Sequence, residues 1–104
     1  MAEYRKITAQ DAYELMSEPH ILLDCRTEAE FREWHIDGAI LIPDYEIYDR
    51  VEAELPDKDA LILIYCRSGR RSALIADDMI YLGYTNLYDF GGIIDWHYDI
   101  VYNS

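Results

Sequence analysis

Residues 60–83, ALILIYCRSGRRSALIADDMIYLG, carry the most informative pattern in the chain. The first six residues of this stretch, 60–65, form an apolar and partly β-branched run, which predicts a strand buried on both faces. The polarity changes at Cys66, and residues 67–71 are too polar to belong to a core. Over 72–83 the apolar residues recur with the spacing of one helix face. The stretch therefore predicts a strand, a tight basic loop and an amphipathic helix.

The loop after Cys66 has the composition of an anion-binding site. A loop that leads into a helix directs several backbone N–H groups at one point, and the helix dipole adds positive charge there. A cysteine in such surroundings has a depressed pKa and is present as the nucleophilic thiolate. We therefore expect Cys66 to be a nucleophile. The alternative, a structural cysteine at a strand end, fits the abrupt change in charge less well.

Different roles are expected for the six residues that follow, which are Arg67, Ser68, Gly69, Arg70, Arg71 and Ser72. Arg67 and Arg70 are predicted to contact the anion, since guanidinium groups deepen the positive potential of the loop. Arg71 can contact it too, or can pair with an acid such as Asp24. The two serines are expected to form hydrogen bonds within the loop and at the helix start rather than to act as catalysts.

The composition predicts one globular domain over residues 1–104. Hydrophobic residues make up 51% of the chain and charged residues 29%, which argues against disorder. The net charge is -12, from 21 acidic residues against 9 Lys and Arg. This excess of acid argues against a nucleic acid partner, because a phosphate backbone binds a basic face. Three of the nine basic residues lie in the loop, which favours a small anion as its ligand.

We expect a cytoplasmic, reduced protein with no membrane contact. The first six residues are polar and do not resemble a secretory leader, and no stretch approaches the length of a membrane span. The chain has two cysteines, Cys25 and Cys66. They are too few for a disulfide framework and lack the spacing of a zinc site.

Short strand and helix patterns alternate along the rest of the chain. Further strands are expected over 4–7, 21–24, 39–42 and 86–88, and further helices after Thr8, over 27–34, over 45–55 and from the pair Gly91-Gly92 to about Ile100. Thr8 with Asp11, and Thr27 with Glu30, have the spacing of helix N-caps. This alternation predicts an α/β fold with a mostly parallel sheet and helices on both faces. Ligand sites in such sheets lie at the carboxyl ends of the strands, where both Asp24-Cys25-Arg26 and Cys66 fall.

Four segments, in the right order, resemble the single-domain rhodanese-like sulfurtransferases. They are LLDCRTEAEF (22–31), HIDGAILIP (35–43), the active-site loop YCRSGRRS (65–72), and a closing signature made of LGY (82–84), GGI (91–93) and Trp96. The resemblance covers nearly the whole chain. It implies a rhodanese-like α/β fold with a mostly parallel, five-stranded sheet wrapped by helices.

The resemblance also implies a thiosulfate sulfurtransferase that works by double displacement. Cys66 would attack the outer, sulfane sulfur of an anion such as thiosulfate and release sulfite. The resulting persulfide would pass its sulfur to cyanide, a small thiol or a protein acceptor. Arg67, Arg70 and the loop amides can stabilise the leaving sulfite, and no metal or organic cofactor is needed.

The chain departs from the family pattern at three positions. Trp34 stands where the family has a glycine suited to a left-handed helix cap, so we expect a different local backbone and an indole at the pocket rim. Asp37 replaces a common proline, with little expected effect. Cys25 replaces a valine, and it is either a core residue or a redox partner of Cys66, since the sequence does not fix the direction of its side chain. Asp24 and Arg26 beside it are expected to support the loop edge.

Two other functions compete with sulfur transfer. Cysteine phosphatases and arsenate reductases resemble a histidine, a cysteine, five residues and an arginine, whereas here Tyr65 precedes Cys66 and Ser72 takes the arginine position. A persulfide relay or binding module for one partner protein is the second alternative. An intact Cys66 and a basic loop argue against an inactive domain, but they do not separate a general enzyme from a dedicated relay.

Overall fold

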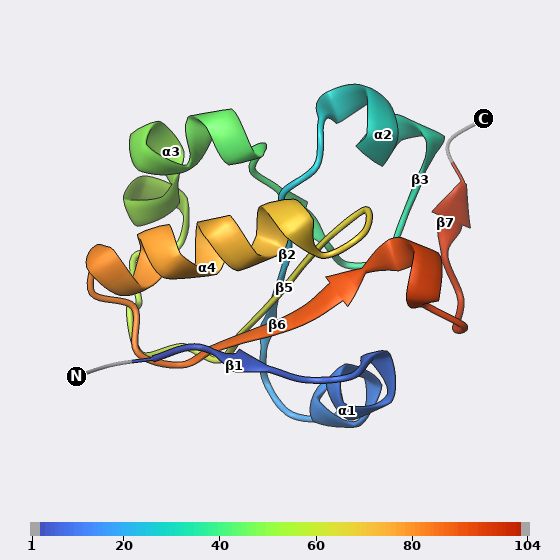
Figure 1. Cartoon of the computed structure of the whole chain (residues 1–104), viewed down its shortest axis with the longest axis horizontal. Coiled ribbons are helices and arrows are strands. Elements are labelled where there is room, and N and C mark those ends of the chain that lie inside the picture. The colour runs from blue at the N-terminus through green and yellow to red at the C-terminus, as the bar shows by residue number, and fades with distance from the viewer. Residues whose placement is uncertain (1–2, 103–104) are drawn as a thin grey trace.

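The computed structural model describes residues 3–102, which form a five-stranded sheet and a separate two-stranded sheet (Figure 1). The strands of the large sheet, in spatial order, are β1 (Arg5–Lys6), β6 (Leu87–Gly92), β5 (Ile62–Cys66), β2 (Ile21–Asp24) and β4 (Ile40–Leu41). The small sheet pairs β3 (Trp34–His35) with β7 (Val101–Tyr102). The helices are α1 (Ala9–Leu15), α2 (Glu28–Glu33), α3 (Ile47–Glu54) and α4 (Arg70–Tyr81), with 3-10 turns η1 (Asp44–Glu46) and η2 (Ile93–Asp95). Every neighbouring pair in the large sheet is parallel, which confirms the predicted α/β fold.

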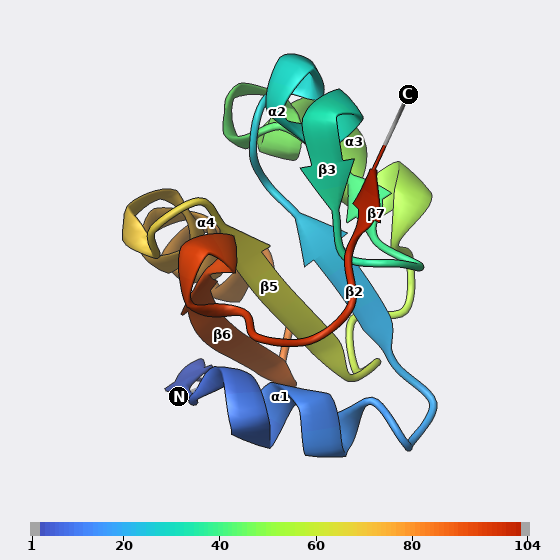
Figure 2. The same cartoon turned by 90° about the vertical axis from the view of Figure 1, so that its right-hand side faces the viewer.

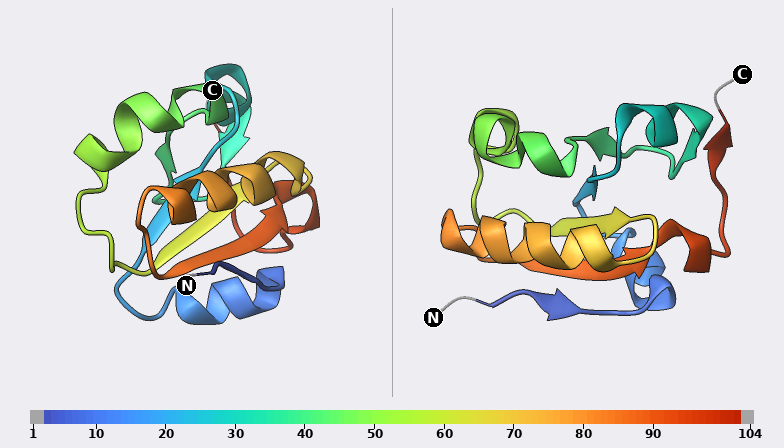
Figure 3. Two further views of the ribbon diagram at one scale, coloured as in Figure 1. Left: turned by 60° about the vertical axis from the view of Figure 1, so that its left-hand side comes forward. Right: turned by 45° about the horizontal axis from the view of Figure 1, so that its top comes forward.

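Helices cover both faces of the large sheet (Figures 1 and 3). One core lies between the sheet and the helices α3 and α4, and includes Leu23, Ile64 and Met79. The second core lies on the face that carries α1 (Figure 2), and includes Leu63 and Trp96. Successive residues of a strand point to opposite faces, so each central strand supplies both cores. None of the helices described over residues 3–102 is both long and apolar enough to cross a membrane.

The central strand and its helix lie close to where the apolar pattern predicts them. All five residues of β5 are buried, as expected for a strand covered on both faces. The strand extends one residue beyond the predicted run and ends on Cys66 itself. Helix α4 begins at Arg70, two residues before the predicted start, because Gly69 adopts the left-handed conformation at the N-cap with φ of 98°. A first helical turn tolerates polar residues, so the apolar period does not reveal its beginning.

Two predicted N-caps are confirmed as capping boxes. At α1 the Asp11 N–H donates to the Thr8 hydroxyl at 3.0 Å, and the Thr8 N–H donates back to the Asp11 carboxylate at 3.3 Å. At α2 the Glu30 N–H donates to Thr27 at 3.2 Å, and the Thr27 N–H donates to Glu30 at 3.0 Å. Such a cap stabilises a helix by about 1 kcal/mol. The second box matters for the site, because it fixes the Glu30 carboxylate.

The predicted closing helix is wrong. Strand β6 continues through the two glycines, one 3-10 turn follows, and the chain then extends to β7, which pairs antiparallel with β3. Ile94, which an amphipathic helix over this segment would carry as an apolar residue, is 56% exposed. Trp96 instead packs against Phe90 with ring centroids 5.5 Å apart, and its indole N–H donates to the Asp99 carbonyl at 3.1 Å. Aromatic packing and strand pairing therefore override a helical period of only a few apolar residues.

Candidate active site

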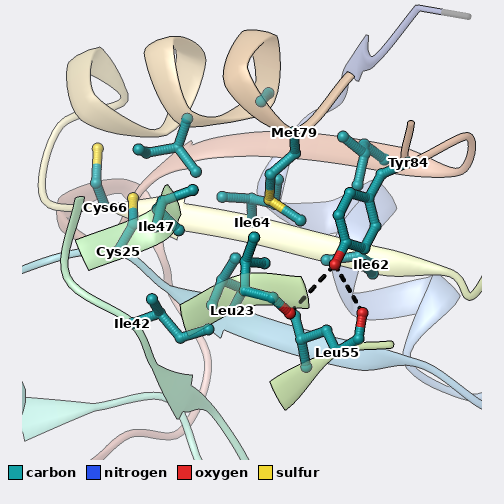
Figure 4. Close-up of a cluster of buried hydrophobic side chains, with 14 residues drawn as sticks. Leu23, Cys25, Ile42, Ile47, Leu55, Ile62, Ile64, Cys66, Met79 and Tyr84 are labelled. Atoms are coloured by element: carbon teal, nitrogen blue, oxygen red, sulfur yellow. Dashed lines mark hydrogen bonds between the residues drawn. The ribbon is translucent and has the colours of Figure 1, made fainter. Parts of the chain in front are cut away.

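The strand register brings the two cysteines side by side at the carboxyl edge of the sheet. Strands β2 and β5 are parallel neighbours, and Asp24 lies opposite Tyr65. Each of these two residues is followed in the sequence by a cysteine, Cys25 after Asp24 and Cys66 after Tyr65. The Cys25 N–H donates to the Tyr65 carbonyl at 3.1 Å and continues the pairing by one residue. Both cysteines are free, fully buried and part of the core beneath α3 and α4. Figure 4 shows both sulfur atoms on the same side of the sheet, which settles the direction of Cys25 that the sequence left open.

The loop after β5 directs a backbone donor at the Cys66 sulfur. The Gly69 N–H lies 3.0 Å from Sγ, and the Ser72 hydroxyl oxygen lies 3.5 Å from it. Gly69 can do this because its positive φ turns the chain into α4 without a side-chain cap. A side chain at this position would also lie 3.2 Å from the Gly91 Cα. The dipole of the 12-residue helix α4 adds partial positive charge at the same point.

These surroundings lower the pKa of the Cys66 thiol to about 4. A hydrogen bond from the neighbouring Cys25 thiol has the largest effect, and donors from Ser72 and Gly69 add to it, while burial of the sulfur opposes them. The pKa of Cys25 is raised, mainly by the same hydrogen bond and by burial. The Tyr65 carbonyl, 3.3 Å from the Cys25 sulfur, is a second acceptor for the Cys25 proton. At neutral pH Cys66 is therefore the thiolate and Cys25 keeps its proton.

Asp89 is a buried site residue that the sequence did not reveal. Its carboxylate accepts the Ser72 hydroxyl at 2.7 Å and the Gly91 N–H at 2.9 Å, and its side chain is 3% exposed. The Ser72 hydroxyl has one proton to donate, and the Asp89 carboxylate is a nearer acceptor than the Cys66 sulfur. The hydrogen bonds that the loop donates to the sulfur therefore come from backbone N–H groups. The available signal was an acid within the apolar strand that precedes the two glycines.

Asp24 and Arg26 form a buried ion pair at the end of β2. The Arg26 guanidinium donates to both Asp24 oxygens, with its shortest contact at 2.8 Å, and also to the Trp34 carbonyl at 2.7 Å. Its central carbon lies over the rings of Trp34 and Tyr65, 5.4 and 5.6 Å from their centroids. The ion pair thus links the end of β2 to β3. This geometry suits the role predicted for Asp24 and Arg26, which is to support the edge of the loop.

Trp34 adopts an ordinary extended backbone rather than a left-handed helix cap. Its φ is -170°, a value open to any residue, so the family's glycine is not needed at this position. The residue belongs to β3 and pairs with Tyr102 of β7. It also lines a small pocket of about 110 Å³, together with Arg26, Glu30, Glu33 and Arg67. Cys66 is not among the residues that line this pocket, so the place of Trp34 at the rim of the active-site pocket stays a prediction.

The three loop arginines differ in their contacts. Arg71 pairs with an acid, which is Glu30 rather than Asp24, through two hydrogen bonds of 2.7 and 3.0 Å. This pairing is the largest cause that lowers the pKa of Glu30 to about 2. Arg67 and Arg70 are exposed, and neither forms an ion pair within residues 3–102. Two guanidinium groups at the loop thus remain open to an anion.

The chain belongs to the rhodanese-like domain family, whose match spans residues 8–99. It is 33% identical over 73 residues to thiosulfate sulfurtransferase PspE of Escherichia coli K12, covering 70% of each chain. It is 31% identical over 94 residues to thiosulfate sulfurtransferase GlpE of Haemophilus influenzae, covering 89% of this chain and 88% of that protein. A crystal structure of a rhodanese-related protein from Thermoplasma volcanium superposes with a TM-score of 0.83 at 30% identity, over 94% of this chain and 98% of the other. The predicted family is confirmed.

Proposed function

We propose that this protein is a sulfurtransferase that moves the sulfane sulfur of thiosulfate, or of a similar anion, through a persulfide on Cys66. The observation that carries the proposal is the Gly69 N–H, which lies 3.0 Å from a thiol whose pKa is lowered to about 4. A thiolate at neutral pH attacks without a separate base. The relatives PspE and GlpE are named thiosulfate sulfurtransferases, which supports the substrate class.

In the first half-reaction the Cys66 thiolate attacks the outer sulfur of thiosulfate. A bond forms between the two sulfur atoms, and the bond to the inner sulfur breaks with its electron pair, so that sulfite leaves as an anion. Arg67 and Arg70 are exposed at the loop and have no acidic partner among the described residues, so they are free to bind the entering and leaving anions. The negative charge then lies on the outer sulfur of the persulfide, within reach of the loop N–H donors.

Access to the sulfur requires movement of the loop. Cys66 is fully buried, while Arg67 and Ser68 above it are exposed. A displacement of residues 67–69 away from the sheet opens a path to the sulfur and makes room for one more sulfur atom. We expect Ser68 and Gly69 to surround that atom from the loop side.

In the second half-reaction an acceptor removes the outer sulfur. Cyanide, a small thiol or a protein thiol can each attack it and return Cys66 to the thiolate. The two surrounding arginines favour an anionic acceptor such as a thiolate. A cytoplasmic location, where such thiols are reduced, is part of the proposal.

The proposal is tested by the intact mass of the reduced protein after exposure to thiosulfate, beside a Cys66→Ser variant. With cyanide present from the start, we expect the wild type, and not the variant, to release sulfite, to form thiocyanate and to return to the mass of the reduced protein. Absence of sulfite from the wild type, with thiosulfate and with mercaptopyruvate as donors, would overturn the proposal and favour a binding module.

An aryl phosphate assay separates the competing phosphatase activity. The sixth residue after Cys66 is Ser72, whose hydroxyl is engaged by Asp89, so no arginine stands where a phosphatase loop would need one. We expect no phosphate release above the level of the Cys66→Ser variant.

A further inference from the structure

We propose that Cys25 is a resolving thiol, which displaces the outer sulfur of the Cys66 persulfide as sulfide and closes a Cys25–Cys66 disulfide. The inference rests on the proposed function, because it needs the persulfide. It adds a second activity to the same site, the reduction of a sulfane sulfur at the expense of two protein thiols.

The first support is the position of the two thiols. Cys25 and Cys66 directly follow Asp24 and Tyr65, which lie opposite each other on adjacent parallel strands. Adjacent strands lie about 4.7–4.9 Å apart. This spacing falls within the roughly 4.4–6.8 Å between Cα atoms that a disulfide spans. Both side chains leave the same face of the sheet (Figure 4), so the bond requires rotation of side chains rather than a new register.

The second support is burial. Both cysteines are fully buried in one core. An external thiol must displace the loop to reach the persulfide, whereas Cys25 is already beside it. A nucleophile held next to its target reacts as if present at a very high concentration, which favours the internal reaction when no acceptor is bound.

The third support is the change in charge when the persulfide forms. In the resting protein the Cys25 thiol donates a hydrogen bond to the Cys66 thiolate, and this bond raises the pKa of Cys25. Once Cys66 is a persulfide, its inner sulfur is neutral and the charge lies one bond farther away. The main influence that keeps Cys25 protonated is then weakened. The charged outer sulfur is also the natural acceptor for the Cys25 proton.

The step balances without an added oxidant. A bond forms between the Cys25 and Cys66 sulfur atoms, and the bond between the Cys66 sulfur and the outer sulfur breaks. The electron pair of the broken bond and the Cys25 proton leave with the outer sulfur as hydrosulfide. Two thiols are oxidised to a disulfide and the sulfane sulfur is reduced to sulfide. A dithiol reductant in solution then restores both thiols by disulfide exchange.

The experiment is a single turnover under anaerobic conditions with thiosulfate and without cyanide or free thiol. Sulfite, sulfide and intact mass are followed for the wild type, Cys25→Val and Cys25→Ser. We expect the wild type to release sulfite and then sulfide, and to end two hydrogens lighter than the reduced protein. The two variants should release sulfite, keep the added sulfur and yield at least about tenfold less sulfide. Wild type incubated without thiosulfate should keep two titratable thiols.

The possible results separate this inference from the proposed function. Sulfite release with a stable added sulfur on the wild type, equal to that on Cys25→Val, overturns the resolving role and leaves the sulfurtransferase intact. No sulfite from the wild type overturns both. Because the decisive readouts are made on the wild type, they hold even where a Cys25 variant fails to fold.

Discussion

Strands β2 and β5 end side by side at one edge of the sheet, each beside a cysteine, yet the two ends differ in electrostatics. At the end of β2 the charges of Asp24 and Arg26 neutralise each other, and the Cys25 thiol meets a carbonyl oxygen at 3.3 Å. At the end of β5 the Cys66 sulfur meets a backbone N–H at 3.0 Å. A carbonyl favours the protonated thiol and an N–H favours the thiolate.

The comparison shows that the hydrogen-bond partners of a cysteine, more than its position in the sheet, decide its reactivity. Both residues are fully buried in the same core cluster. The largest cause of the lowered Cys66 pKa is the hydrogen bond from Cys25, and the left-handed turn at Gly69 adds a backbone N–H donor that Cys25 lacks. Four substitutions test this asymmetry, and their expected effects decrease from Cys66→Ser to Glu30→Gln.

Removal of the thiol at the end of β5 should have the largest effect. Cys66→Ser places a hydroxyl with a far higher pKa in the same position, so thiosulfate:cyanide activity should fall by roughly three orders of magnitude or more. Cys25→Val should retain measurable cyanide-dependent activity. Equal losses in the two variants would show that the two strand ends are not functionally distinct.

Gly92→Ala should break the loop that supplies the donor. A Cβ on Gly92 would lie well within contact distance of the Arg67 carbonyl and the Ser68 Cα, so the loop must move. We expect a loss of about 3 kcal/mol in the free energy of unfolding, measured by urea denaturation. Gly38→Ala is the matched control, since nothing lies within 4 Å of its Cβ and only its φ of 84° is strained. The free energy of unfolding of Gly38→Ala should fall by about 1 kcal/mol.

Cys25→Val should shift the pH dependence of Cys66. The wild-type thiolate is present above a pKa of about 4 and is lost as the pH falls through that value. Without the Cys25 donor the pKa of Cys66 rises, so the alkylation rate by iodoacetamide should fall at a higher pH than in the wild type. For a rise of about one pKa unit we expect alkylation to be roughly twofold slower at pH 5, and close to tenfold slower only at a pH well below both pKa values. Cys25→Ser, which keeps a donor, should give a smaller shift.

Glu30→Gln should loosen the link between the helices that follow the two strands. Glu30 of α2 binds Arg71 of α4, and its pKa is lowered to about 2 from an ordinary 4.5. Its stabilising effect is therefore present above about pH 4.5 and is lost as the pH falls towards 2. The free energy of unfolding of the variant should be about 1 kcal/mol lower at pH 7. Its melting temperature should also fall less steeply than that of the wild type as the pH is lowered.

A matched exposed pair provides the control for Glu30→Gln. Glu28 and Arg32 are 3.3 Å apart, with side chains 67% and 70% exposed. Glu28→Gln should change the free energy of unfolding by less than about 0.5 kcal/mol. A loss as large as that of Glu30→Gln would show that the Glu30–Arg71 pair has no special role.

The local patterns of the sequence predicted most of the fold. The β5 strand, the loop and α4 are contiguous, and their apolar periods and N-caps depend on neighbours within a few residues. The segment over 93–102 was mispredicted because its structure depends on distant partners. Trp96 packs on Phe90 and α1, and β7 pairs with β3 far back in the chain. No local period encodes those contacts.

The candidate site shows the same division. The candidate nucleophile and the basic loop could be predicted because Cys66 and the arginines lie within one short stretch. Asp89 and the choice of Glu30 as the partner of Arg71 depend on contacts across 17 and 41 residues. The direction of Cys25 depends on the register between two strands, which the sequence does not specify on its own. The roles predicted for Arg67 and Arg70 stay predictions.

The pairing of β7 with β3 has a consequence for the biosynthesis of the protein. β3 includes Trp34, and the Trp34 carbonyl accepts a hydrogen bond from the buried Arg26 guanidinium. A ribosome delivers the chain from its N-terminus, so β3 waits for its partner strand until residue 102 has left the exit tunnel. β5, α4 and β6 all precede β7 in the chain, so β7 is the last strand to become available for pairing at this edge of the molecule.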